Sequence, residues 1–275
     1  MPSAVFQHAI GARRLLLSNN LRSNPPPPGD RAPAGEVQIP NSHKNGARIN
    51  GVLNALSDNE LDQLTPRLRP FQLEIGDVLY EPDDEIDHVY FPLSGIISLL
   101  AAFADGTTVE AGVIGTEGMA GTPVALGVRS TPHQALVQIE GQALRMSADD
   151  LRAEAKRDGA LLKSMLRYTN AMFVQVAQTA ACNRLHSVEQ RLARWLLLSH
   201  DRVEGDEFEL TQEFMARMLG VRRAGVSVAA NQLREIGAID YRRGNVTVLN
   251  RAVLEGICCE CYQLVKDEYD RSLNS

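Results

Sequence analysis

The chain has 275 residues, of which 44% are hydrophobic and 23% charged, and its formal net charge is −6. This length suffices for one or two globular domains that each bury a core. No apolar run approaches the roughly 20 residues that a membrane helix needs, so we expect a cytoplasmic protein without a membrane segment. The negative net charge excludes a general polyanion binder, and any contact with nucleic acid must come from a local basic surface.

Residues 1–47 form the first compositional segment. They include the run Pro25-Pro26-Pro27-Pro28 and scattered glycine, serine, asparagine and arginine. Such a composition cannot bury a core. We therefore predict that this N-terminal segment is disordered.

Residues 48–157 have the pattern of a β-rich domain. A short amphipathic helix is expected over 51–64, with Ser57 as an internal N-cap candidate. Short strands are then expected, and Asp105-Gly106 indicates a hairpin between two of them. The frequent turns predict a barrel or jelly roll. The strands are predicted at 71–75, 78–80, 88–91, 96–103, 107–109, 133–139 and 142–146.

Residues 158–185 read as a long helix that follows a short one capped by Ser147. The helix is expected over 160–182, because apolar residues recur there at steps of three and four. Such a stripe favours pairing with a second copy of the chain as a dimerisation helix, and packing against the chain's own domains is the alternative. The stripe contains Leu162, Met165, Leu166, Met172, Phe173 and Val176.

Residues 186–275 contain the strongest local signal, a helix-turn-helix at 212–231. Thr211 is a fitting N-cap for the first helix. Ala216 provides the small contact that two closely crossing helices need, and Gly220 provides a positive φ for the turn between them. Val226 is the expected core residue of the second helix.

The second helix is expected to expose four polar side chains, Arg222, Arg223, Ser227 and Asn231. In such motifs this end of the helix enters the DNA major groove, where arginine pairs with guanine and asparagine with adenine. A hairpin over 239–249 follows as a wing, with Arg242 and Arg243 at its tip for phosphate contacts. The segment from residue 218 to 243 contains five basic residues and only two acidic ones. A helix from Arg251 onward is expected to close the domain.

The four cysteines are Cys182, Cys258, Cys259 and Cys261. Their spacing lacks the separated pairs typical of zinc sites and of secreted disulfide frameworks. One interpretation is that the cluster Cys258, Cys259 and Cys261 senses a metal or the redox state. The stretch 257–264 looks helical, which favours the other interpretation, small buried residues in a helix. We therefore predict neither a bound metal nor a cofactor.

In the order of its parts the chain resembles the CRP/FNR family of bacterial transcription regulators. The segments 76–80 and 89–95 are similar to parts of that family's cyclic-nucleotide-binding-like jelly roll, and 211–233 to its winged helix-turn-helix. The resemblance implies an α+β protein with a sensor domain, a dimerisation helix and a DNA-binding domain. It also implies a homodimer on a two-fold symmetric DNA site, an effector in the sensor, and RNA polymerase as a further candidate partner.

The resemblance points to Glu117 as the ribose-contacting residue of an effector site and to Arg129 and Ser130 as its phosphate-binding segment. Pro132 and the neighbours of Glu117 depart from the family's pattern for cyclic AMP, so the effector stays unknown. Members that sense oxygen with an iron–sulfur cluster use N-terminal cysteines, and the first 181 residues here have none. Ala224 and Gly225 stand where the family often carries glutamate, so a different DNA site is expected.

Two rival functions remain. In the first, the chain is a ligand-binding signalling module whose helix-turn-helix contacts protein instead of DNA, and the clustered arginines count against it. In the second, the chain is an enzyme. No nucleophile–base pair, phosphate-binding loop or paired metal ligands on a helix appear, and the histidines look isolated. We therefore predict that the chain is not an enzyme.

Overall fold

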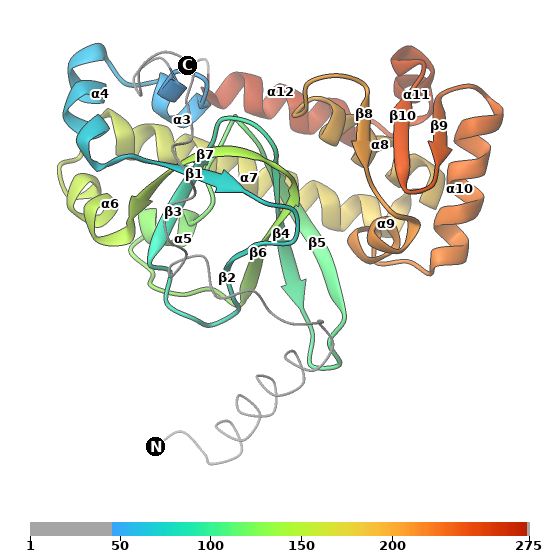
Figure 1. Cartoon of the computed structure of the whole chain (residues 1–275), viewed down its shortest axis with the longest axis horizontal. Helices are drawn as coiled ribbons and strands as arrows, with labels where there is room; N and C mark the ends of the chain where they lie inside the picture. The colour runs from blue at the N-terminus through green and yellow to red at the C-terminus, as the bar shows by residue number, and fades with distance from the viewer. Residues whose placement is uncertain (1–45, 274–275) are drawn as a thin grey trace.

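The computed structural model describes residues 46–273, and Figure 1 shows two lobes joined by a long helix. One lobe is a β-roll and the other a helical domain with a small sheet, which confirms the predicted α+β class and the order of its parts. The disorder predicted for residues 1–47 lies outside the described residues, except for the last two positions. Those two, Gly46 and Ala47, are helical and buried, so the prediction is wrong for them. No helix within 46–273 is long and apolar enough to cross a membrane.

The β-roll begins with two short helices where one was expected. They are α3 (Gly51–Asn54) and α4 (Asp58–Leu64), followed by a 3₁₀ turn (Thr65–Arg67). Ser57 does cap a helix, because its hydroxyl accepts from the Glu60 amide while the Glu60 carboxylate accepts from the Ser57 amide. This capping box starts a new helix and so separates α4 from α3.

Seven strands form the two antiparallel sheets of the roll. One sheet has the order β1-β7-β3 and the other the order β2-β6-β4-β5. The predicted hairpin at Asp105-Gly106 joins β4 to β5, and Gly106 has a φ of +83°. Bulges interrupt the register of β4, which helps the sheet to curve. The strands are β1 (Arg69–Leu73), β2 (Val78–Tyr80), β3 (His88–Pro92), β4 (Ile96–Ala102), β5 (Thr108–Ile114), β6 (His133–Ile139) and β7 (Gly141–Ser147).

One helix lies within the roll, and two more lead from its last strand to the second lobe. The one-turn helix α5 (Thr122–Ala125) lies between β5 and β6, and α6 (Ala148–Ala155) is capped by Ser147 as predicted. The long helix α7 (Ala160–Leu185) runs slightly past its expected end. Gly118 allows α7 to lie close to the roll, because a Cβ at that glycine would clash with the ring of Tyr168 on α7.

The second lobe has a helix-turn-helix and a three-stranded sheet. Two of the strands form the predicted wing, whereas β8 was not predicted; it pairs with β10 on the side away from β9. The elements are α8 (Val188–His200), β8 (Glu207–Glu209), α9 (Gln212–Leu219), α10 (Arg223–Glu235), β9 (Ile239–Arg242), β10 (Asn245–Val248), α11 (Arg251–Ile257) and α12 (Cys261–Leu273).

The single closing helix predicted from Arg251 onward is wrong in two respects. The helix is interrupted between α11 and α12. The second helix, α12, turns back along α7 toward the β-roll (Figure 1). Asn170 of α7 donates to the Glu268 carboxylate at 2.7 Å, and Gln175 donates to the Tyr269 hydroxyl at 2.8 Å. Part of the α7 surface is thus covered by the chain itself.

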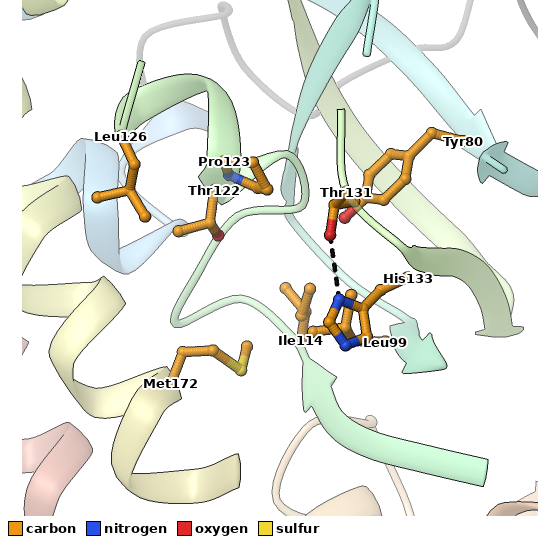
Figure 2. Close-up of a pocket in the computed structure, with 9 residues that line it drawn as sticks. All are labelled: Tyr80, Leu99, Ile114, Thr122, Pro123, Leu126, Thr131, His133 and Met172. Carbon is orange, nitrogen blue, oxygen red and sulfur yellow. Dashed lines mark hydrogen bonds between the residues drawn. The ribbon is translucent and has the colours of Figure 1, made fainter. Parts of the chain in front are cut away.

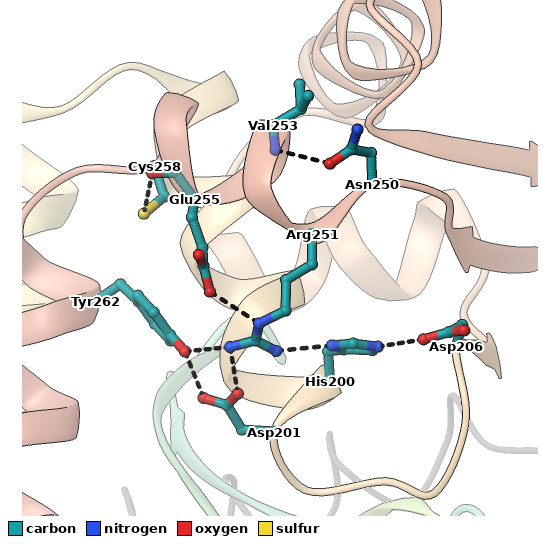
Figure 3. A network of polar contacts seen from close by, with 9 residues as sticks. All are labelled: His200, Asp201, Asp206, Asn250, Arg251, Val253, Glu255, Cys258 and Tyr262. Atoms are coloured by element: carbon teal, nitrogen blue, oxygen red, sulfur yellow. Dashed lines mark hydrogen bonds and ion pairs between the residues drawn. The ribbon is translucent and has the colours of Figure 1, made fainter.

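A polar network holds the corner where α8, α11 and α12 meet (Figure 3). Arg251 donates to Asp201 at 2.6 Å, to the Tyr262 hydroxyl at 2.5 Å and to His200 Nδ1 at 2.8 Å. Since His200 Nδ1 accepts, its Nε2 donates to Asp206, at 2.8 Å. His200 is therefore a structural link and not an isolated side chain.

Candidate nucleic-acid interface and sensor cavity

The helix-turn-helix has the local geometry that the sequence predicts. The Thr211 hydroxyl accepts from the Phe214 amide at 3.1 Å and begins α9. Gly220 ends α9 in the left-handed conformation, with φ +61° and ψ +39°. Ala216 and Val226 are both buried where the two helices meet. These positions fix how α10 stands on α9.

The outer face of α10 is exposed along its first two turns. Arg222, which was expected on this helix, is its N-cap and stands directly before its first residue, Arg223. Val228 has 59% of its surface exposed, and with Ala224 it adds two apolar side chains that the sequence analysis had not assigned to this face. Alanine and valine methyl groups suit contacts with thymine methyls. The exposed or half-exposed residues of the face are Arg222, Arg223, Ala224, Ser227, Val228 and Asn231.

Ser227 is engaged within the motif. Its hydroxyl lies 2.6 Å from Oε1 of Gln212, at the start of α9, and 3.1 Å from the Arg223 carbonyl. The half-buried serine therefore links the two helices, and it orients Gln212 beside the exposed face. This contact was not predicted.

The wing turns tightly at its tip. Arg243 and Gly244 have φ values of +52° and +92°, the conformation of a two-residue hairpin turn. Arg242 pairs with Asp240 at 2.8 Å, but its side chain remains largely exposed. The Tyr241 hydroxyl accepts from the Gln212 amide at 3.1 Å and ties the wing to α9. The tip therefore has a fixed position beside the helix-turn-helix.

The arginines of this surface are largely without acidic partners. Within residues 46–273, Arg222, Arg223 and Arg243 make no ion pair. Each is exposed, so its charge is available to an external anion. The acidic net charge of the chain thus coexists with a basic face on this lobe.

The β-roll contains a cavity of about 130 Å³ against α7 (Figure 2). Its wall is mostly apolar, and the polar contact drawn in it is that between Thr131 and His133, at 3.0 Å. Cavities that hold small-molecule ligands usually measure about 300–1,000 Å³. The lining residues are Tyr80, Leu99, Ile114, Thr122, Pro123, Leu126, Thr131, His133 and Met172, and no arginine or lysine is among them.

The three residues predicted for an effector site do not line this cavity. Glu117 pairs with Arg202, after α8, at 2.9 Å, and both side chains are mostly buried. Arg129 is on the surface and pairs with Glu85 at 2.6 Å, while Ser130 forms a β-bridge with the same glutamate. The structure therefore does not bring the three together around one ligand position.

A second buried carboxylate links the lobes. Glu110 of β5 accepts from Trp195 Nε1 of α8 at 2.7 Å and from the Ser98 hydroxyl at 2.7 Å. Burial raises the pKa of Glu110 to about 7. The neighbouring Val109 lies against Gly220, so β5 touches the helix-turn-helix at its turn. The two lobes are thus connected through β5.

This combination of a β-roll, a long helix and a winged helix-turn-helix defines a two-domain regulator architecture. Residues 70–158 match the model of the cyclic nucleotide-binding domain, and residues 190–257 match the model of the Crp-like helix-turn-helix domain. Together the two matches span more than half of the chain. The chain belongs to the CRP/FNR family of transcriptional regulators.

Solved structures share this fold. FixK2 from Bradyrhizobium japonicum is 17% identical, with a TM-score of 0.60 over 70% of this chain and 98% of that one. A putative Crp/Fnr-family regulator from Eubacterium rectale is 16% identical, with a TM-score of 0.61 over 76% and 98%. The c-di-GMP-responsive regulator CLP from Xanthomonas campestris is 15% identical, with a TM-score of 0.55 over 70% and 100%. A search of curated proteins finds no match.

Proposed function

We propose that the chain binds a two-fold symmetric DNA site as a homodimer and regulates transcription there. The observation that carries this proposal is the exposed face of α10, where Arg222 and Arg223 stand without acidic partners among residues 46–273. Their guanidinium groups would pair with guanine in the major groove, and Asn231, about two turns further along α10, would pair with adenine. Ser227 would position Gln212 beside them, and Arg242 and Arg243 would contact phosphates.

The proposed dimer rests on the exposed side of α7, where Leu162 and Val176 on its flank also pack against the chain's own core. Phe173 is 70% exposed and Leu166 is 46% exposed, although both are large and apolar. With Leu162, Thr169 and Val176, which are half-buried, they recur at alternating steps of four and three. This spacing is the seam of a two-stranded coiled coil. A second copy of α7 is the partner that would bury it.

We infer that DNA binding does not require a cyclic nucleotide. A cyclic phosphate needs a cation to pair with it in a buried site. Arg129 is at the surface and paired with Glu85, and the cavity beside α7 is lined without a cation. This cavity would therefore accept only a small, apolar effector, and a charged effector would bind at another site. RNA polymerase is proposed as the partner through which a bound dimer acts.

Selection of duplexes from a random DNA pool tests this proposal. The purified full chain is used without added ligand, at near-physiological salt, and the bound sequences are read. Recovery of a two-fold symmetric site supports an effector-independent DNA-reading dimer. Failure of a folded dimer to select any sequence, with or without cyclic nucleotides, would favour the rival function in which the helix-turn-helix contacts protein.

A further inference from the structure

Four side chains that can ligate a metal converge where α7 ends. Cys182 and His186 lie one helical turn apart at the end of α7, and Cys259 and Cys261 flank the corner between α11 and α12. One ligand atom from each residue lies within 4.8 Å of all the others. We propose that Cys182, His186, Cys259 and Cys261 form a tetrahedral site for a thiolate-preferring divalent cation, with Zn²⁺ as the best match.

The distances suit a metal with four protein ligands. Zinc–sulfur bonds of about 2.3 Å in a tetrahedron place two sulfurs roughly 3.8 Å apart. The Cys182 and Cys259 sulfurs are 3.5 Å apart, and His186 Nδ1 is 3.5 Å from the Cys261 sulfur. Small side-chain adjustments would therefore suffice for coordination. Three cysteines and one histidine are a set found in closed, structural zinc sites.

The groups around the cluster support this role. His186 turns Nδ1 toward the cysteines, while its Nε2 lies 3.4 Å from the Glu260 carboxylate. A carboxylate behind a ligating histidine fixes the ring and its tautomer. Gln178 donates to the Cys261 sulfur at 3.1 Å, as an amide does to a thiolate. Three thiolates around Zn²⁺ leave one negative charge, and the buried Arg194 lies close enough to offset it.

The sulfur atoms of the cluster lie away from solvent. Cys182, Cys259 and Cys261 are all buried and form a small core cluster of their own. Metal binding would release the thiol protons, so affinity would rise with pH.

This arrangement corrects the interpretation of the cysteines as residues of one helix. The helix is interrupted between Ile257 and Cys261, and this interruption lets Cys259 and Cys261 face α7. Cys258 points elsewhere, because its sulfur donates to the Glu255 carbonyl at 3.3 Å (Figure 3). The sequence did hold one signal that was overlooked, the pair Cys182 and His186, which are four residues apart. A bound metal would fasten α12, and with it the corner held by Arg251, to the end of the dimerisation helix.

Titration of the reduced, metal-free full chain with Co²⁺ tests the proposal, because Co²⁺ reports its geometry and its thiolate ligands in the absorption spectrum. We expect one Co²⁺ per chain, thiolate charge-transfer bands, tetrahedral d–d bands and displacement by Zn²⁺. Cys258→Ala is the matched control and should bind as the parent does. Cys182→Ala and Cys261→Ala should lose the spectrum.

Exposed Glu260 offers a variant that does not disturb the buried cluster. Glu260→Gln should keep the tetrahedral spectrum and weaken binding by roughly 10–100-fold. A folded parent chain that binds no Co²⁺ or Zn²⁺ would overturn the proposal. An octahedral spectrum, or equal losses in Cys258→Ala and Cys261→Ala, would also overturn it. Oxidation that joins Cys182 to Cys259 in a chain without metal affinity would identify a redox pair instead.

Discussion

The helix-turn-helix lobe and the β-roll differ in how their charged side chains are used. In the first, Arg222 and Arg223 are exposed and make no ion pair within residues 46–273. In the second, Glu117 is paired with Arg202 and Arg129 with Glu85, and the cavity is lined almost entirely by apolar groups. The lobe with unpaired arginines is suited to bind a polyanion, whereas these charges of the β-roll are held in ion pairs, one within the roll and one to the other lobe.

The largest expected effect concerns the exposed seam of α7. Phe173→Glu should place two like charges against each other in the dimer and leave monomers. Affinity for a two-fold symmetric site should then fall by roughly 10²–10⁴-fold, because the second half-site no longer binds intramolecularly. Sedimentation measures the oligomeric state, and fluorescence anisotropy measures the affinity for DNA. Leu264→Glu is the control, because Leu264 is an exposed apolar residue of α12. A dimeric Phe173→Glu chain would contradict the assignment.

The next effect tests the contrast between the two lobes directly. Arg222→Ala and Arg223→Ala should each cost about 1–3 kcal/mol of DNA-binding free energy and relax specificity at the contacted base. Arg129→Ala removes an arginine of the β-roll that is also exposed, and it should leave the affinity unchanged. Anisotropy titrations on a selected duplex measure all three. Parent-like binding by both helix variants would show that α10 does not enter the groove.

Two glycines of the helix-turn-helix lobe should respond in opposite directions to alanine. Gly220 has φ +61°, and an added Cβ would lie 3.2 Å from the Val109 side chain. Gly220→Ala should lower the free energy of unfolding by about 1–2 kcal/mol. Gly225, inside α10, has nothing within 4 Å of its added Cβ, and Gly225→Ala should raise stability by up to about 1 kcal/mol. Urea unfolding would measure both changes.

The carboxylate between the lobes predicts a pH dependence. The pKa of Glu110 rises on folding from 4.5 to about 7, so the folded chain binds more protons than the unfolded chain between these values. The contribution of Glu110 to the free energy of unfolding therefore falls as pH rises through that window, and it levels off above it. Glu110→Gln should flatten this slope. Urea unfolding between about pH 5 and about pH 8 measures it, and an unchanged slope would contradict the prediction.

The smallest effect is expected at the wing. Replacing Arg242 and Arg243 by alanine should weaken DNA binding about equally for all sequences. The slope of log affinity against log salt should decrease by about one per lost phosphate contact. Arg242 already pairs with Asp240, so Arg243 should contribute the larger part. A change in sequence preference would instead indicate base contacts by the wing.

Local signals in the sequence predicted most elements of both lobes. The caps at Ser57, Ser147 and Thr211, the turn at Asp105-Gly106 and the positive φ of Gly220 all occur as expected. Such features depend on a few neighbouring residues, so they can be read from the chain alone. The exposure of Arg222 and Arg223 was predicted from the helix-turn-helix motif, which is also a local pattern.

Contacts between distant segments could not be predicted in this way. Glu117 was assigned to an effector, yet Arg202 lies 85 positions along the chain and pairs with it. Cys182 and Cys259 are 77 positions apart and lie 3.5 Å from each other only because α12 returns along α7. The sequence by itself determined helices, turns and exposed faces, because these depend on local propensity and periodicity. Which charges are paired and which thiols meet was decided by tertiary packing, since it alone brings remote side chains within bonding distance.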